Sequence, residues 1–246
     1  MTICALSSGS GQSGVAVLRI SGSETKSLIE MITKKSLPPP RKASLLKLYN
    51  INTSSLIDEG IVLWFPAPNS YTGEDMAELH VHGSRGVITE IQNNLLSTKK
   101  CRMAEPGEFT KLAFVNGKIN LLKAEAIGDL IAAETQIQID QAQSIIRGKS
   151  FLKFQNIREK IIKILGTMEA KIDFPEEDIP ENVIENINNE IENIEIEIKK
   201  ILDDNNVGEK IRTGFKIAIV GPPNSGKSSL MNYFSKRDVS IVSEIA

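Results

Sequence analysis

Residues 216–230 constrain the fold of this chain more than any other segment. They read Lys-Ile-Ala-Ile-Val-Gly-Pro-Pro-Asn-Ser-Gly-Lys-Ser-Ser-Leu, so four residues separate Gly221 from Gly226-Lys227-Ser228. This is the phosphate-binding pattern G-x-x-x-x-G-K-[ST], which requires a strand before it and a helix after it. The apolar run 217–220 predicts a buried strand, and a helix is expected from Ser228 to about Ser235. The segment therefore predicts the start of a P-loop nucleotide-binding domain.

Each residue type in this loop has a role toward a bound phosphate. Glycines let successive backbone N–H groups point at phosphate oxygens, and the positive end of the following helix faces the same anion. Lys227 would neutralise the β- and γ-phosphates, and the Ser228 hydroxyl would ligate Mg²⁺. We expect the phosphates of the nucleotide to contact Asn224, Ser225, Gly226, Lys227, Ser228 and Ser229.

A complete P-loop domain needs several more strands, a second acid for Mg²⁺ and residues that read the base. Few residues follow Ser228 in this sequence. We expect residues 213–246 to form an incomplete P-loop domain, and residues 1–246 alone to show negligible nucleotide turnover.

Composition sets broad limits on the protein class. A chain of 246 residues with a net charge of −2 can bury one or two cores and carries no bulk field that demands nucleic acid or membrane. Cys4 and Cys101 are far apart in sequence, and we expect reduced thiols. The first residues lack a secretion signal, and no apolar run approaches the length of a membrane span. These features favour a soluble, cytoplasmic protein.

Residues 1–118 alternate between strand-like and helix-like segments, which predicts a compact α+β domain. The expected strands are 2–6, 15–20, 43–50, 61–65, 76–82 and 101–103, and the expected helices are 26–34, 84–96 and 106–116. Trp64 should pack against the sheet, and Gly117 suits the left-handed position after the last helix.

Two other patterns in this domain have weaker interpretations. Gly9, Gly11 and Gly14 match a dinucleotide fingerprint, but a strand-like run follows them where the fingerprint requires a helix. Glu78, His80 and His82 fall on one strand face and could ligate a metal, although no third neutral ligand is marked nearby. A polar face around a ligand pocket, or simple solvent exposure, is the alternative.

Residues 119–212 are helical in pattern. We expect a helix from 121 to about 148, a second from 151 to 172, a solvated acidic loop at 173–180, and a third helix that carries a heptad stripe. The stripe consists of Ile184, Ile187, Ile191, Ile194, Ile198 and Ile201. Its length fits an antiparallel helical bundle better than a long coiled coil.

Several motifs then occur in a fixed order along the chain. They are Leu18-Arg-Ile-Ser-Gly22, Pro68-Asn-Ser-Tyr-Thr-Gly-Glu-Asp75, Pro106-Gly-Glu-Phe-Thr110, Asn116-Gly-Lys118, Leu121-x-x-Ala-Glu-Ala126, Ile172-Asp-Phe-Pro175 and Gly221-x-Pro-Asn-Ser-Gly-Lys-Ser-Ser229. The set closely resembles the MnmE or TrmE family of tRNA-modification GTPases, and the resemblance spans the whole chain.

This resemblance implies a function for the first domain. The family's N-terminal domain is similar to folate-dependent one-carbon enzymes, dimerises, and binds 5-formyltetrahydrofolate or a related tetrahydrofolate. The family's folate contacts fall on Arg19, Glu78 and Lys118. A carboxylate can pair with ring donors, and basic groups can meet the ligand's acceptors and glutamate tail.

The resemblance also implies a GTPase that uses Mg²⁺ and K⁺. Asn224 resembles the residue that ligates K⁺ in the family, with Ser243 and Ile245 as further K⁺ contacts. The start of the switch loop around GTP and K⁺ falls on Ser243, Glu244, Ile245 and Ala246. With the flavoprotein GidA (MnmG), in a heterotetramer, the family modifies wobble uridine of tRNA at carbon 5 and takes the one-carbon unit from the folate.

The sequence departs from the family pattern at Pro222, where a basic residue is common, and at Asn120, where an acid is common. The later GTPase motifs and a terminal Cys-x-Gly-Lys are not in the sequence. Three alternatives stay open. They are a folate-binding dimerisation module without GTPase activity, a ribosome-assembly GTPase without a folate pocket, and a P-loop ATPase.

Overall fold

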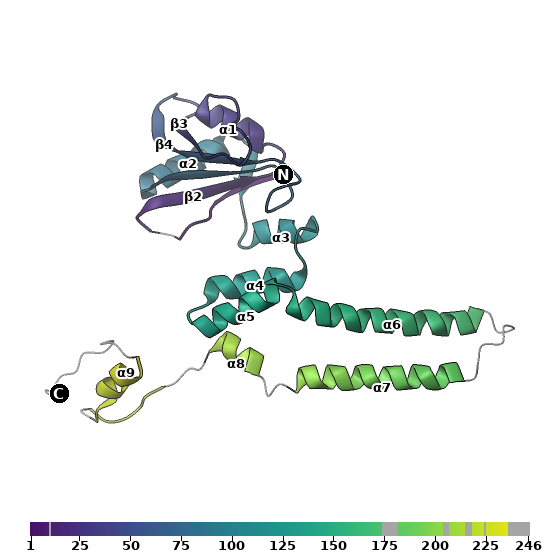
Figure 1. Ribbon diagram of the computed structural model, residues 1–246. Helices are drawn as coiled ribbons and strands as arrows, with labels where there is room; N and C mark the ends of the chain where they lie inside the picture. The colour runs from purple at the N-terminus through teal and green to yellow at the C-terminus, as the bar shows by residue number, and fades with distance from the viewer. Residues whose placement is uncertain (10, 174–181, 204–206, 215–217, 224, 236–246) are drawn as a thin grey trace. The chain divides into compact units, whose positions relative to one another are not determined.

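The computed structural model describes residues 1–9, 11–173, 182–203, 207–214, 218–223 and 225–235, with side chains from residue 186 onward in the range 182–203 (Figure 1). The chain divides into two compact units. The first comprises residues 1–128 and 143–151, and the second comprises residues 129–142 and those from 152 onward.

One sheet organises the first unit. In the described residues its strands are β1 (Thr2–Leu6), β2 (Ser13–Ser21), β3 (Ser44–Tyr49), β4 (Leu56–Phe65), β5 (Met76–Gly83) and β6 (Cys101–Met103), in the order β3-β4-β5-β2-β1-β6. Neighbouring strands are antiparallel except β1 and β6, which are parallel. The helices α1 (Thr25–Thr33) and α2 (Arg85–Ser97) complete the expected α+β domain.

The core lies between the sheet and α1 and α2. Alternate residues of each strand point to it, because successive side chains of a strand face opposite sides. The central strands contribute Leu18, Ile20, Val62 and Leu79, all fully buried. Trp64 joins this core at 6% exposure, as predicted. The helices contribute Leu28, Ile29, Ile32, Ile88, Ile91 and Leu95.

Strand β4 is longer than the sequence indicated. The expected strand began at residue 61, but β4 begins at Leu56 and carries Asp58 and Glu59. The turn is shorter because Asn50 organises it: its side-chain oxygen accepts hydrogen bonds from the N–H groups of residues 52 and 53. Gly60 then allows β4 and β5 to approach, since an added Cβ would lie 2.3 Å from the His80 carbonyl oxygen.

The two cysteines meet in this core although they are 97 residues apart. Cys4 on β1 and Cys101 on β6 are free, buried thiols with their sulfur atoms 3.8 Å apart. The expectation of unpaired thiols is confirmed. The hydrogen bond between them, together with burial, raises the pKa of the Cys4 thiol far above its usual range, so that it stays protonated.

The first helix expected in the helical region is divided in two. In place of one helix from 121 to 148, the structure has α4 (Leu121–Ala132) and α5 (Gln136–Ile146). Thr135 and Gln138 form a capping box that starts a new helix: the Gln138 side chain accepts from the Thr135 N–H at 3.0 Å, and the Thr135 hydroxyl accepts from the Gln138 N–H at 3.4 Å. Asn120 likewise caps α4 by accepting from the Lys123 N–H.

Two long helices, α6 (Lys149–Asp173) and α7 (Asn182–Leu202), follow. Ile157 and Ile164 of α6 bury a cluster with Ile194 of α7, against which Ile187 and Ile201 pack. Lys160 pairs with Glu197, and the later Lys163 of α6 pairs with the earlier Glu190 of α7. The two helices are therefore antiparallel, as predicted. The Ile184 side chain and most of the expected acidic loop lie outside the described residues.

Shorter helices complete the chain that the structure describes: α3 (Glu108–Val115), α8 (Val207–Thr213) and α9 (Lys227–Ser235). Within the described residues, none of the helices combines the length and the hydrophobicity that crossing a bilayer would need.

Candidate functional site

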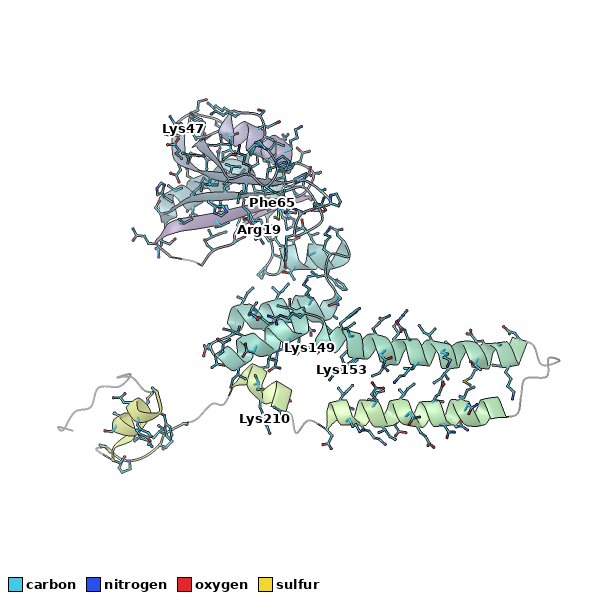
Figure 2. All side chains as sticks on the ribbon, in the orientation of Figure 1. Arg19, Lys47, Phe65, Lys149, Lys153 and Lys210 are labelled. Carbon is cyan, nitrogen blue, oxygen red and sulfur yellow. The ribbon has the colours of Figure 1, made fainter. Side chains whose placement is uncertain are left out.

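Arg19 and Glu78 form an ion pair at the centre of the sheet face opposite the core. They are direct partners in the β2–β5 register. Because Leu18 and Ile20 point into the core, Arg19 must point to the other face. Its Nε and Nη2 atoms donate to Glu78 Oε1 at 3.0 and 2.8 Å. Both side chains are mostly buried, at 26% and 16% exposure, so the pair is shielded from bulk water (Arg19 is labelled in Figure 2).

Two aromatic rings enclose the guanidinium. The centroids of Tyr71, in the β4–β5 loop (residues 66–75), and Phe109, in α3, each lie 5.5 Å from Arg19 Cζ. The Tyr71 hydroxyl hydrogen-bonds the Thr110 hydroxyl at 2.9 Å. The β4–β5 loop and α3 therefore meet over Arg19, where cation–π attraction holds the guanidinium.

Lys118 also contacts the β4–β5 loop. Its ammonium donates to the Pro68 carbonyl oxygen at 2.8 Å, and Asn116 donates to the Thr72 carbonyl oxygen at 2.8 Å. Gly73, at φ 82°, lies so close that an added Cβ would stand 3.3 Å from Lys118 carbons. Arg19, which pairs with Glu78, and Lys118 thus both contact the β4–β5 loop.

A pair of buried hydroxyl groups anchors the β4–β5 loop to β2. Ser21 of β2 and Thr72 of the loop lie 2.7 Å apart through their hydroxyl oxygens, and Ser21 also donates to Glu74 at 3.3 Å. The Thr25 hydroxyl at the start of α1 donates to the Asp75 carbonyl oxygen. These bonds fix the loop relative to the strands that carry Arg19 and Glu78.

Helix α3 is held at its start by Glu108. Its carboxylate accepts from Arg102 and from the Glu105 N–H, and these bonds, in that order of size, lower its pKa to about 2. Glu108 therefore stays ionised in neutral and mildly acidic solution. The predicted left-handed Gly117 after this helix is confirmed at φ 67°.

The two histidines of β5 do not complete a metal site. His80 Nε2 lies 3.4 Å from Glu78 Oε2, whereas His82 Nδ1 bonds Asp58 at 2.8 Å. Burial opposes ionisation of Asp58, but the hydrogen bonds from His82 and Glu59 outweigh it and lower its pKa. Within the described residues, no group of three or more histidine, cysteine or acidic side chains could hold a metal ion.

The phosphate-loop segment agrees with its prediction only in part. Helix α9 starts at Lys227, one residue before the expected Ser228, and ends at Ser235 as expected, and Gly226 has φ 82°. The Ser225 hydroxyl and the Lys227 ammonium both donate to the Pro222 carbonyl oxygen, so both side chains lie over the loop. Ser228 and Ser229 lie in the first turn of α9.

The buried strand expected before this loop is wrong over residues 218–220. They form no strand, and Val220 is 90% exposed. A strand takes its backbone hydrogen bonds from neighbouring strands, and the sheet of the described residues draws its strands from residues 2–103. Ile217, Asn224, Ser243, Glu244, Ile245 and Ala246 lie outside the described residues.

Two protein-family profiles match the chain in succession. "GTP-binding protein TrmE N-terminus" covers residues 2–118, and "MnmE helical domain" covers residues 121–244, half of the sequence. The chain belongs to the MnmE/TrmE family.

Curated MnmE relatives align along the whole chain. A protein named "tRNA modification GTPase MnmE" from Pelagibacter ubique is 61% identical over 246 residues, which is 100% of this chain and 56% of that protein. The protein of the same name from Rickettsia akari is 45% identical over 245 residues, 100% of this chain and 55% of that protein. The chain therefore spans about half the length of the curated relatives that it matches.

Sequence reasoning about the MnmE family named Arg19, Glu78 and Lys118 but missed the residues that hold them. Tyr71, Thr72 and Phe109 occur in the quoted motifs, yet no role was assigned to them. Their spacing gives no sign of the contacts, because the β4–β5 loop and α3 meet only in the folded unit. The sequence offered one signal for them, the run Tyr71-Thr-Gly73 between two strands, because functional residues are often found on loops.

Proposed function

We propose that this chain is the N-terminal portion of a tRNA-modification GTPase whose first domain, residues 1–118, binds a tetrahydrofolate. A helical domain at 119–212 and the start of a GTP-binding domain at 213–246 would follow. The folate part of this proposal is carried by one observation: the Arg19–Glu78 pair, through Arg19, and Lys118 contact the same anchored loop. The 61% identity with a tRNA modification GTPase along the whole chain supports the rest.

The residues around the β4–β5 loop fit a folate chemically. Glu78 Oε2 does not bond Arg19 and can accept from the N–H donors of the pterin ring. The Lys118 ammonium can bind the glutamate tail. Arg19, fixed between Tyr71 and Phe109, orients the Glu78 carboxylate. When bound, the tetrahydrofolate would supply a one-carbon unit, and these side chains would bind and orient it.

The P-loop residues fit the phosphates of GTP. The Lys227 ammonium and the Ser225 hydroxyl lie over the loop, where the phosphates would bind, and the first turn of α9 directs its N–H groups to the same side. Ser228 would ligate Mg²⁺. Asn224, Ser243 and Ile245 would ligate K⁺, and Gly226, Ser229, Glu244 and Ala246 would add nucleotide contacts.

The proposed partners are a second copy of this chain, the flavoprotein GidA (MnmG) in a heterotetramer, and tRNA, whose wobble uridine would be modified at carbon 5. One observation supports a homodimer through the first domain. Leu45 and Ile61 are register partners on β3 and β4 and are both exposed. Neighbouring exposed apolar side chains of this kind can contribute to a contact surface.

A second candidate function is specific to residues 1–246 as a polypeptide. The exposed, strandless residues 218–220 favour a folate-binding module in which the nucleotide domain is not assembled. A ribosome-assembly GTPase is less well supported, since residues 2–118 match the TrmE N-terminus.

The polypeptide 1–246 is expected to release negligible phosphate from GTP, because a P-loop alone does not position the water or the second Mg²⁺ ligand. Phosphate release with and without K⁺ measures this, with the Lys227→Ala variant as the background. K⁺-stimulated turnover of the wild-type chain above that background would contradict the expectation.

Calorimetric titration of residues 1–246 with 5-formyltetrahydrofolate tests the proposed folate site. We expect saturable binding with one site for each chain, unchanged by Lys227→Ala, because that residue belongs to the phosphate loop. Absence of saturable heat at millimolar ligand would contradict the folate assignment.

A further inference from the structure

The segment between α1 and β4 carries a local excess of positive charge. Residues 31–57 contain five basic and no acidic residues, in a chain with 29 basic and 31 acidic residues overall. All five side chains are exposed. We define this set as the basic strip: Lys34, Lys35, Arg41, Lys42 and Lys47.

The strip runs along the edge strand β3. At one end, Lys34 Nζ lies 4.9 Å from the centroid of the Tyr49 ring, in the last residue of β3. Lys47 lies within the strand, and Arg41 and Lys42 directly precede it. Arg41 Cζ lies 5.7 Å from the centroid of Phe65, at the end of β4. Figure 2 labels Lys47 and Phe65 on this unit. At about 3.4 Å per residue, β3 itself spans roughly 17 Å from Ser44 to Tyr49.

Little in the folded unit neutralises this charge. Among the described residues, no ion pair joins a strip residue to an acidic side chain. Glu59 is the register partner of Lys47, and Arg41 donates to the Asn69 carbonyl oxygen. The strip thus presents exposed cationic groups beside half-buried aromatic rings, which is a common composition for surfaces that bind nucleic acid.

We propose that the basic strip binds the phosphate backbone of tRNA. This rests on the proposed function, because the relatives' printed names make tRNA the polyanion on which they act. A row of cations along an extended strand can follow a phosphate chain. A membrane surface is favoured instead by an amphipathic helix with a basic face, whereas Lys47 lies in β3 and the other strip residues lie in the non-helical connection between α1 and β3. Contacts to phosphates would hold the RNA without reading its sequence.

Lysines on an edge strand have a second possible role, which is to prevent strands of different chains from pairing. The two roles make different predictions for charge removal. Loss of edge protection causes aggregation and leaves RNA affinity unchanged, whereas loss of a phosphate-binding surface weakens RNA binding and reduces its salt dependence.

The test variant is Lys35→Ala/Lys42→Ala/Lys47→Ala in residues 1–246. Lys34 and Arg41 are retained because they lie against the rings of Tyr49 and Phe65, and alanine would remove these contacts. The matched control is Lys26→Ala/Lys111→Ala/Lys153→Ala, which removes three exposed lysines elsewhere and changes the net charge equally. Binding of fluorescent tRNA is measured by anisotropy over a range of salt concentrations.

The test variant should lose at least about tenfold in affinity at low salt, and its slope of log K against log salt should fall by about 2 to 3. The control should stay within about threefold of the wild type. Equal losses in both variants, no loss in the test variant, or no tRNA binding by the wild-type chain would overturn the proposal. So would capture of the wild type by phosphatidylserine-containing vesicles without RNA binding, or aggregation of the test variant with unchanged RNA affinity.

Folate calorimetry on the same variants separates this proposal from the proposed function. The test variant should bind 5-formyltetrahydrofolate like the wild type, since no strip residue contacts the Arg19–Glu78 pair. Folate binding with no effect of the strip on RNA would overturn only the strip. RNA binding that depends on the strip, with no folate binding, would overturn the folate assignment.

Discussion

Leu79→Ala is expected to lower the free energy of unfolding of the first unit by about 2–5 kcal/mol. Leu79 on β5 is fully buried, between its register partners Leu18 on β2 and Val62 on β4, which are also fully buried. Truncation leaves a cavity at the middle of the sheet, where rigid backbone on both sides prevents collapse. A loss of this size is a large part of the stability of a typical domain.

Trp64 makes this prediction measurable for one unit. It is the only tryptophan of the chain and lies in the same core, so its fluorescence reports unfolding of that core. Urea titrations should show a lower midpoint for Leu79→Ala with a similar slope. The control Leu56→Ala removes the same atoms from a side chain that is 54% exposed on β4, and should change stability by under about 0.5 kcal/mol. Equal midpoint shifts in the two variants would contradict the assigned core.

Glu78→Ala is expected to weaken 5-formyltetrahydrofolate binding by about 10- to 100-fold. Hydrogen bonds to a charged group contribute about 1.5–3 kcal/mol, and the substitution also leaves Arg19 mostly buried without its carboxylate partner. Both effects act on the proposed site.

Calorimetric titration gives the affinity, and Trp64 fluorescence establishes that the variant is folded. Glu59→Ala is the matched control, because Glu59 is an exposed acid on the adjacent β4 strand. Arg19→Ala should weaken binding less than Glu78→Ala if Arg19 chiefly orients the carboxylate. Affinity of Glu78→Ala within threefold of the wild type would contradict the role assigned to Glu78.

Much of the first unit could be predicted because its strands alternate. The alternation of Leu18, Arg19 and Ile20 places one charged side chain on the face opposite the core, and the structure confirms that placement. The heptad stripe of α7 similarly predicted that Ile187, Ile194 and Ile201 pack against α6, whereas Ile191 and Ile198 of the same stripe are 45% and 38% exposed. These predictions succeed because the spacing of apolar residues along the chain indicates both the type of element, strand or helix, and the face that it buries.

The remaining features depend on contacts between distant residues. The break between α4 and α5 is an exception, because it depends on the nearby residues Thr135 and Gln138. The prediction missed it because good helix formers lie on both sides. At Val220 the local pattern predicted a strand that did not form, and the residue is exposed. An apolar run forms a strand only beside partner strands. The cover that Tyr71 and Phe109 form over Arg19 joins segments 38 residues apart, and no local pattern marks it.

The central claim is that Arg19, Glu78, Lys118 and the β4–β5 loop form one folate site. Two-dimensional ¹H–¹⁵N spectra of residues 1–246, titrated with 5-formyltetrahydrofolate, test it most directly. We predict saturable shifts of the Arg19 Nε–Hε signal and of the backbone amides of Tyr71, Thr72 and Lys118, with the amides of α7 unchanged. Shifts confined to residues outside this loop and its contacts, with the Arg19 signal unmoved at saturation, would contradict the account.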